Sequence, residues 1–356
     1  EYQVDVTGNV VISKPASAGK ENCPITILQS HMDMVQEKNS NVDHDFETDA
    51  IQPQQDGEWI KATGTTLGAD NGIGIAAMLA VMQSTDIAHG PMEFLFTVDE
   101  ETGLTGAKEL DAGMLKGRRL INLDSEEEAT LCVGCAGGAD SELTLPLTFA
   151  DPPPEGASLR IRLAGLQGGH SGIDIHLQRG NATQLLARAL HAVSLTTPFD
   201  VAGLTGGNAH NAIPREAVAE VVVAHDDREA FVEAMTPELE AIKSEFQTVE
   251  PDTVWEISDI GSPGEVWSRA TAKRVLRLIN ALPHGVMMMS NDIPGLVETS
   301  TNLATVSQQG HSLVIGLSSR SSVASALTAL RQRIRATAAL SGATVEEDQG
   351  YPCLLY

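Results

Sequence analysis

Short apolar runs separated by turn residues fill the first 137 positions of the chain. The runs at 25–30, 93–98 and 119–123 are almost continuously apolar, which is typical of strands whose two faces are both covered. Residues 72–82 are almost wholly apolar as well and predict a buried helix between two of these strands. This alternation predicts an α/β domain in which a mostly parallel sheet is flanked by helices.

The pattern changes at about residue 138, where strands of alternating polarity replace the continuous apolar runs. Such strands occupy 142–147 and 158–163, and a helix that begins at Ala182 has its apolar residues on one face. Later elements are a strand at 217–224, helices at about 228–247 and 268–282, a hairpin over 303–317 that turns at Gln309 and Gly310, and a long helix with Val323, Leu327, Leu330 and Ile334 in register. Two strand-strand-helix groups predict a second domain, an α+β sandwich with one antiparallel sheet and helices on one face.

The composition is that of a globular protein with two domains. A chain of 356 residues exceeds the size at which a single core stops growing, and 42% of its residues are apolar. Its formal net charge of −25 repels nucleic acid and anionic membranes, so we expect neither as a partner. The sequence contains no apolar run long enough to span a membrane and no signal-peptide pattern, so a cytoplasmic protein is the default expectation.

The chain has four cysteines, which are too few for a disulfide framework. Cys132 and Cys135 form a C-x-x-C spacing in an apolar, glycine-rich turn, but no second pair accompanies them. We expect buried free thiols there, and a zinc knuckle or a redox pair is the less favoured alternative.

Acidic and histidine residues follow the predicted strands of the first domain where these strands end. His31 follows 25–30, Glu100 and Glu101 follow 93–98, Asp124 follows 119–123, and Asp70 precedes the apolar helix. Ligands of open α/β sheets collect at the carboxyl ends of the strands, so the series predicts one shared metal site. Each residue taken singly is better explained as a solvated strand end, but the ordered set favours the metal site.

The residue types limit the chemistry of this site. His31 and Asp33 are two apart and share a face of a strand, and a metal-bound imidazole usually needs a carboxylate behind it to fix its tautomer. Glu100 and Glu101 are adjacent and point different ways, so one could bind a metal while the other reaches the water beside it. Histidine and carboxylates without a thiolate suit zinc, cobalt or manganese in a site that activates water.

Six segments carry a resemblance to a known family. They are HMDMV at 31–35, GTTLGADNG at 64–72, EETG at 100–103, NLDSEE at 122–127, GGHSG at 168–172 and NAIPRE at 211–216. Together and in this order they resemble the co-catalytic zinc exopeptidases, and within them the bacterial dipeptidases that include enzymes acting on aminoacyl-histidine. The likeness extends over essentially the whole chain.

The resemblance implies two zinc ions per subunit, with Co²⁺ or Mn²⁺ as substitutes. Carried over position by position, it makes His31 and Asp124 ligands of one metal and Glu101 a ligand of the other, with Asp70 bridging the two. Glu100 matches the general base that takes a proton from the water and returns it to the leaving amine.

The resemblance also assigns residues that do not bind metal. Asp33 matches the carboxylate behind the histidine ligand, and His170 matches a histidine that helps stabilise the tetrahedral oxyanion. Asn211 and Arg320 match residues that hold the substrate, where the planar fork of an arginine grips a terminal carboxylate in two places. Simpler alternatives stay open: His170 as a surface residue in a glycine-rich turn, and Arg320 as a cap of the helix that follows it.

The resemblance further implies how the chain is divided. It makes 1–137 an incomplete catalytic metal-binding domain and 138–350 a lid through which a homodimer could form, with 351–356 as the start of the return to the catalytic domain. The family closes its second metal site with a histidine after that return. We therefore expect a piece of a longer protein, truncated at both ends, whose second metal has only Asp70 and Glu101 as protein ligands, so that activity of the chain as written is open.

Three functions follow from these observations. The leading one is metal-dependent hydrolysis of unblocked dipeptides, including Xaa-His. The second is a related metal-dependent amidohydrolase that removes the acyl group of N-acyl amino acids. The third is an inactive remnant that folds mainly as a lid and dimerisation module.

Overall fold

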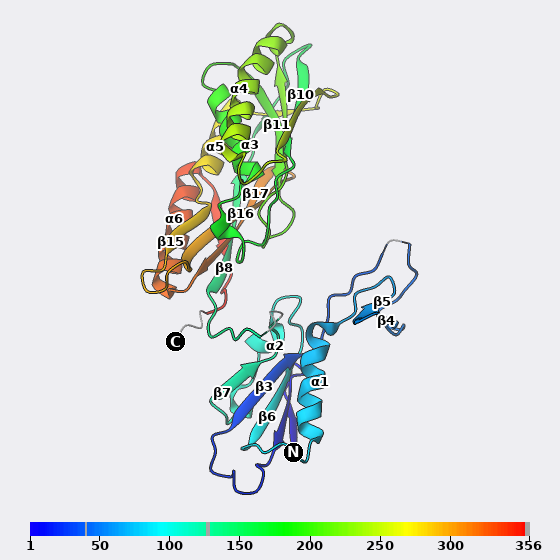
Figure 1. The fold of residues 1–356 in the computed structure, drawn as a ribbon. Helices are drawn as coiled ribbons and strands as arrows, with labels where there is room; N and C mark the ends of the chain where they lie inside the picture. Colours follow the sequence, from blue (N-terminus) through cyan, green and yellow to red (C-terminus); the bar gives the residue numbers. More distant parts are fainter. Residues whose placement is uncertain (40, 126–128, 353–356) are drawn as a thin grey trace. The chain divides into compact units, whose positions relative to one another are not determined.

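The computed structural model describes residues 1–39, 41–125 and 129–352. The chain forms two compact units, Glu1–Cys132 and Val133–Tyr356 (Figure 1). Glu126 and Glu127, which belong to one of the six segments, lie outside the described residues, as does Cys353. Within the described parts, no helix is both long and apolar enough to cross a membrane.

The first unit is built on a five-stranded mixed sheet in the order β1-β2-β6-β3-β7. Its strands are β1 (Tyr2–Val4), β2 (Val10–Lys14), β3 (Thr26–His31), β6 (Met92–Thr97) and β7 (Arg119–Asn122). β3 runs parallel to both β6 and β7, whereas the hairpin β1–β2 adds two antiparallel strands beside β6. The predicted α/β class is confirmed, and the three parallel strands are those that precede the predicted metal ligands.

Helix α1 (Ala69–Gln83) covers one face of this sheet. Its Met78 is fully buried and packs with Phe94 and Phe96 of β6. The prediction of a wholly buried helix is wrong, because only one side of α1 packs on the sheet and Ile73 is 71% exposed. An apolar run does not by itself show which face of the helix packs against another element.

The opposite face is covered by the segment between β6 and β7. This segment contains the short helix α2 (Thr105–Lys108) and the 3-10 helix η1 (Ala112–Met114), whose Met114 packs with Val11 and Leu95 of the sheet. The expectation that β7 is covered on both faces is wrong, since all four of its residues are exposed. The physical reason is its position at the edge of the sheet, beside β3.

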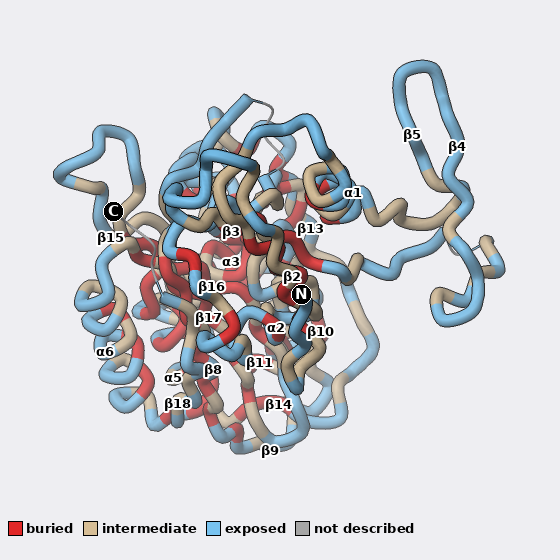
Figure 2. The backbone as a smooth tube through the Cα atoms, turned by 90° about the horizontal axis from the view of Figure 1, so that it is seen from below, coloured by how far each residue is buried: buried red, intermediate tan, exposed pale blue. Residues whose placement is uncertain are grey.

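Between β3 and α1 the chain forms a separate hairpin, which the sequence pattern does not predict. It consists of β4 (Pro53–Asp56) and β5 (Trp59–Ala62). The hairpin projects away from the sheet and is exposed along nearly its whole length (Figure 2).

The second unit is a nine-stranded antiparallel sheet with its helices on one face (Figure 1). Eight strands follow the order β13-β10-β12-β11-β16-β17-β8-β18, and β15 pairs with β16. The strands are β8 (Gly137–Pro146), β10 (Ala157–Ala164), β11 (Asp200–Gly206), β12 (Ala217–Val223), β13 (Val254–Asp259), β15 (Gly285–Met289), β16 (Val297–Gln309), β17 (Ser312–Ser321) and β18 (Thr344–Glu347). The helices are α3 (Ala182–Val193), α4 (Arg228–Phe246), α5 (Arg269–Ala281) and α6 (Ala324–Ser341). The predicted α+β sandwich is confirmed.

Smaller elements complete the second unit. A short pair is formed by β9 (Phe149–Ala150) and β14 (Val266–Trp267), and two 3-10 helices are η2 (Ile175–Leu177) and η3 (His225–Asp227). The predicted hairpin is β16–β17, in which Gln309 pairs with Ser312 on either side of the turn. β11, β13, β15 and β18 have no counterpart among the predicted elements.

One large apolar cluster fills the second unit. Helix α3 contributes the five residues predicted to share a face, all of them buried: Leu185, Leu186, Ala189, Leu190 and Val193. The cluster lies between the helices and the sheet, so the packing follows from the amphipathic helices and the alternating strands.

The cysteines depart from the prediction. Cys132 and Cys135 are exposed, as is Cys23. The expectation of buried thiols at the C-x-x-C spacing is wrong, because this stretch lies where the chain passes from the first unit to the second and belongs to neither core.

His284 is a partly buried titratable group of the second unit. Its Nδ1 accepts a hydrogen bond of 3.3 Å from the Leu303 N–H and one of 3.3 Å from the side-chain amide of Asn181. Burial lowers the pKa of His284 to about 4. The imidazole is therefore neutral in the folded protein at neutral pH.

We expect acid to destabilise the second unit through His284. The unfolded ring binds a proton below its ordinary pKa of 6.5, whereas the folded ring binds one only near pH 4. The stability supplied by the neutral ring is therefore fully present above pH 6.5 and is lost as the pH falls toward 4, by at most about 1.4 kcal/mol per pH unit. Urea unfolding across this range should show a steeper loss for the wild type than for His284→Gln, and equal slopes would contradict the prediction.

Candidate metal centre

His31 and four carboxylates of the first unit converge at the carboxyl ends of its parallel strands. His31 is the last residue of β3 and is 1% exposed. Its Nε2 lies 2.9 Å from Asp70 Oδ1 and 3.4 Å from Asp124 Oδ1. The ligand atoms of these three residues lie within 4.8 Å of one another, and so do those of His31, Glu100 and Glu101. The five residues predicted from the strand ends are thus brought together.

Asp33 supports this cluster in a way that differs in part from the prediction. Nδ1 of His31 lies 3.0 Å from the Asp33 backbone carbonyl oxygen and 3.4 Å from the carboxylate. The two carboxylate oxygens accept the backbone N–H groups of Glu100 and Glu101, each at 3.0 Å. Burial alone would raise the pKa of Asp33, but these N–H groups hold it below its ordinary value. The carboxylate therefore fixes the Glu100–Glu101 backbone, and the closer contact to His31 comes from the backbone carbonyl.

The first turn of α1 presents Asp70 through an irregular backbone. Gly68 has a φ of 75°, a left-handed conformation that glycine adopts without strain, and Asp70 and Asn71 have non-helical angles joined by a cis peptide bond. Asn71 is 2% exposed and donates a hydrogen bond of 2.5 Å to Asp124 Oδ1. A Cβ atom at Gly74 would collide with the Asn71 side chain. Gly74, two residues beyond the GADNG segment, thus leaves the space that the buried Asn71 side chain occupies.

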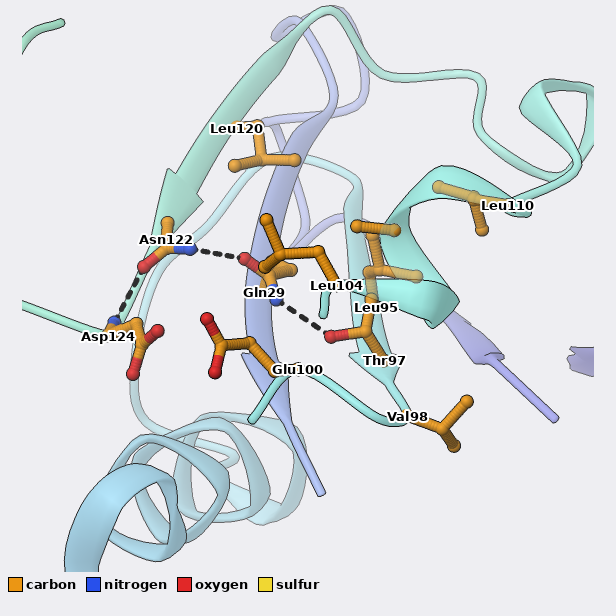
Figure 3. Close-up of a pocket in the computed structure, with 11 residues that line it drawn as sticks. Gln29, Leu95, Thr97, Val98, Glu100, Leu104, Leu110, Leu120, Asn122 and Asp124 are labelled. Atoms are coloured by element: carbon orange, nitrogen blue, oxygen red, sulfur yellow. Dashed lines mark hydrogen bonds between the residues drawn. The ribbon is translucent and has the colours of Figure 1, made fainter. Parts of the chain in front are cut away.

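Side-chain amides fix Asp124 at the end of β7. Asn122 Oδ1 accepts the Asp124 N–H at 2.7 Å, and its Nδ2 donates to Gln29 Oε1 at 2.5 Å. Gln29 in turn donates to Thr97 Oγ1 at 3.0 Å, so the chain of amides crosses all three parallel strands (Figure 3). The same residues line a cavity of about 230 Å³, in which the carboxylates of Glu100 and Asp124 face one another (Figure 3).

The electrostatics of the cluster favour a cation. Burial raises the pKa of Glu100, and the charges of Asp124, Glu101 and Asp33 raise it further. Burial and the neighbouring Asp70 likewise raise the pKa of Asp124. Burial alone would lower the pKa of His31, but the hydrogen bond to Asp70 and the surrounding carboxylates outweigh it and raise the pKa. All three shifts have the sign expected where negative charges are crowded, and a divalent cation would relieve that crowding.

The donor set at this position fits zinc, cobalt or manganese. One imidazole at the end of β3, and carboxylates from two strand ends and one helix start, supply nitrogen and oxygen donors without a thiolate. Both the types of these ligands and their closeness to one another fit such an ion. The residues concerned are His31, Asp70, Asp124, Glu100 and Glu101.

The three predicted residues of the second unit also come together. The Ser171 N–H donates to the Asn211 carbonyl at 2.7 Å, and His170 pairs with Ala212 in a β-bridge. A Cβ atom on Gly172 would lie 3.0 Å from Arg320 Cζ, so the guanidinium lies directly against this glycine. Burial lowers the pKa of His170, and the charge of Arg320 lowers it further. His170 is therefore a neutral imidazole at neutral pH.

Arg320 does not act as a helix cap. It is on β17, its Nη1 donates to Tyr351 Oη at 2.8 Å, and the N-cap residue of α6 is Val323. None of the ion pairs among the described residues includes Arg320. The guanidinium is thus held in place while its charge remains available to an anion.

Two supporting residues, Asn71 and Glu250, are missing from the predicted site, and only Asn71 has a signal in the sequence. Glu250 is 1% exposed, and its carboxylate accepts the N–H groups of Gln167 at 2.6 Å and Gly180 at 3.0 Å, which are the two ends of the loop that carries His170. Asn71 is near Asp70 in a matched segment, so a polar residue beside a predicted ligand is a signal for it. Glu250 lies 83 residues from Gln167, and only the folded structure brings them together.

Comparison with known proteins gives a consistent result. Residues 27–248 match Peptidase family M20/M25/M40. The chain is 39% identical over 348 residues to the Cytosol non-specific dipeptidase of Escherichia coli, covering 98% of this chain and 72% of that protein. Its fold matches the crystal structure of Aminoacylhistidine Dipeptidase from Vibrio alginolyticus with a TM-score of 0.86 and 41% sequence identity, covering 99% of this chain and 72% of that chain. Both whole-chain matches extend over the two units.

Proposed function

The chain belongs to Peptidase family M20/M25/M40 and is a hydrolase of that family, and from this premise we propose that it hydrolyses the peptide bond of unblocked dipeptides, including Xaa-His. The observation that carries the proposal is the cluster in which His31, Asp70 and Asp124 meet within hydrogen-bond distance beside Glu100. The names of the Escherichia coli and Vibrio relatives, both dipeptidases, support the substrate class.

We assign the metal ligands as the sequence motifs imply. His31 and Asp124 would hold one zinc ion, Glu101 would hold the other, and Asp70 would serve both, with Co²⁺ or Mn²⁺ as substitutes. When bound, such ions polarise a carbonyl group and lower the pKa of the hydrolytic water. The distances from His31 Nε2 to Asp70 and Asp124 support the first part of this assignment.

Glu100 is the general base of the proposal. It takes a proton from the hydrolytic water and delivers it to the leaving amine. Its raised pKa, caused first by burial and then by neighbouring carboxylates, supports this role, because a carboxylate with a higher pKa is the stronger base toward the water proton. Asp33 holds the Glu100 backbone through its N–H group.

The second unit supplies substrate recognition in this proposal. Arg320 binds the terminal carboxylate of the dipeptide, Asn211 holds the substrate beside it, and His170 stabilises the oxyanion of the tetrahedral intermediate. Arg320 has no carboxylate partner among the described residues, and this supports its assignment to the terminal carboxylate of the substrate. We assign the catalytic role to the domain 1–137 and the lid and dimerisation role to 138–350, in a cytoplasmic protein that forms a homodimer.

The substrate class can be tested with the purified chain and added Zn²⁺. We expect release of free amino acids from Ala-His and Ala-Ala at a rate at least about a hundredfold above that from N-acetyl-alanine, because an enzyme that requires the free amine of a dipeptide rejects an analogue that lacks it. Faster cleavage of the N-acetyl compound would make the protein an acyl-removing amidohydrolase. Bound zinc without cleavage of either compound would make it an inactive remnant.

A second expectation concerns Glu100. Glu100→Gln should lower kcat by at least about a hundredfold, the usual contribution of a positioned base, while bound zinc measured after dialysis stays unchanged. Glu109→Gln, at an exposed glutamate of the same unit, serves as the control and should leave both quantities unchanged. Loss of zinc in Glu100→Gln would show that Glu100 is a metal ligand.

A third expectation concerns His170. If it acts on the developing oxyanion, His170→Ala should lower kcat by roughly a hundredfold or more with little change in KM, because the interaction forms only in the transition state. His225→Ala replaces an exposed histidine of the same unit and should behave as the wild type. A wild-type kcat in His170→Ala would reduce His170 to a polar residue of a glycine-rich turn.

A further inference from the structure

Asn9 is a fully buried amide in the turn between β1 and β2, and it contacts both ends of the loop that carries Glu100 and Glu101. Its side chain is 0% exposed. Oδ1 accepts the Val98 N–H at 3.2 Å, and Nδ2 donates to the Gly106 carbonyl at 2.8 Å. Val98 follows β6 and Gly106 is in the first turn of α2, and we call the segment between them, both included, the loop 98–106. One side chain thus joins its two ends.

Asp5 fixes the orientation of this amide. Asn9 Nδ2 donates to Asp5 Oδ2 at 2.7 Å, while Asp5 Oδ1 accepts the N–H groups of Thr7, Gly8 and Asn9 at 2.9 to 3.0 Å. Gly8 has a φ of 106°, which only glycine adopts readily. Since Nδ2 must face the Asp5 carboxylate, Oδ1 must face Val98. The DVTGN turn therefore fixes the orientation of the amide that contacts the loop.

At Gly106 the loop lies in close contact with Asn9. Its N–H donates to the Val98 carbonyl at 3.0 Å, which closes the loop across its base. A Cβ atom on Gly106 would lie 2.6 Å from Asn9 Oδ1 and would collide with the Val98 backbone as well. Glycine is thus required at this position for the contact with Asn9 to form.

We propose that Asn9 is a positioning residue of the metal centre, which fixes where the loop 98–106 presents the carboxylates of Glu100 and Glu101. Asp33 accepts the N–H groups of the same two glutamates, so the loop is held at its base by Asn9 and at its tip by Asp33. The loop also contributes Val98, Glu100 and Leu104 to the wall of the 230 Å³ cavity. The link to metal binding rests on the proposed function, whereas the hold on the loop is a property of the first unit alone.

Hydrogen exchange of the whole chain without added metal tests the hold on the loop. Asn9→Asp keeps an acceptor for Val98 but loses both donors, and Gly106→Ala breaks the same contact from the other side. We expect amide exchange in peptides covering 98–106 to become at least about tenfold faster in both variants, while peptides covering β3 keep wild-type protection and show that the unit is folded. Asn41→Asp, at an exposed asparagine, and Gly264→Ala, at a glycine with open space around it, are the matched controls. Wild-type exchange over 98–106 in both variants would overturn the proposal.

A milder variant keeps the test decisive if Asn9→Asp does not fold. Asp5→Asn removes the carboxylate that orients the amide but leaves Asn9 itself in place. We expect an increase in exchange over 98–106 that is smaller than that of Gly106→Ala but above the controls. No increase in either Asp5→Asn or Gly106→Ala would again overturn the proposal.

Metal titration separates this inference from the proposed ligand set. Zn²⁺ binding that involves Glu101 should weaken by about 10- to 100-fold in Gly106→Ala, the usual effect of losing a residue that orients a ligand, and the visible spectrum of the Co²⁺-loaded chain should change with it. Faster exchange of the loop together with unchanged Zn²⁺ affinity and an unchanged Co²⁺ spectrum would show that Asn9 holds the loop but that the loop does not bind the metal, which overturns the positioning role and the ligand assignment of Glu101 together. Unchanged loop exchange overturns the role of Asn9 and leaves the ligand assignment standing.

Discussion

The first unit depends on one electrostatic constraint: several carboxylates are crowded around a single buried imidazole. Asp70 and Asp124 both approach His31 Nε2, and Glu100 lies across the cavity from Asp124. Like charges at such distances repel one another in a partly desolvated site, and the raised pKa values of Glu100 and Asp124 express that repulsion. A flexible chain would relax by moving the carboxylates apart. The arrangement persists only because the surrounding structure holds each group separately.

The groups that do this are almost all uncharged. Asn71 donates to Asp124, and Asn122 accepts the Asp124 N–H. Neutral amides and backbone N–H groups can orient a carboxylate without cancelling its charge, so the site stays attractive to a cation. The second unit uses the reverse arrangement of the same device, since the buried carboxylate of Glu250 joins the two ends of the His170 loop through N–H donors. Both terminal oxygens of a carboxylate accept hydrogen bonds, whereas a side-chain amide has only one such oxygen. This explains an acidic residue at position 250, although none of the ion pairs among the described residues includes Glu250.

The sequence predicts the parts of this structure that depend on local pattern. Parallel strands end at one edge of a sheet, so the residues after 25–30, 93–98 and 119–123 had to be neighbours, and the 3.6-residue period of α3 decided its buried face. Burial that depends on distant neighbours could not be predicted, as the exposed Ile73, the exposed strand β7 and the exposed Cys132 show. The supporting residues could not be predicted from the sequence for the same reason. Asn9 and Val98 are 89 residues apart, and an asparagine in a turn has an adequate local explanation without any loop to hold.

Burial acts on the titratable groups of the two units by one rule, with opposite results. It raises the pKa of Glu100 in the first unit, where the charges of Asp124, Glu101 and Asp33 raise it further. It lowers the pKa of His170 in the second unit, where the charge of Arg320 lowers it further. Burial disfavours the charged form of either group, so an acid and a base shift in opposite directions, and neighbours of like charge add to each shift.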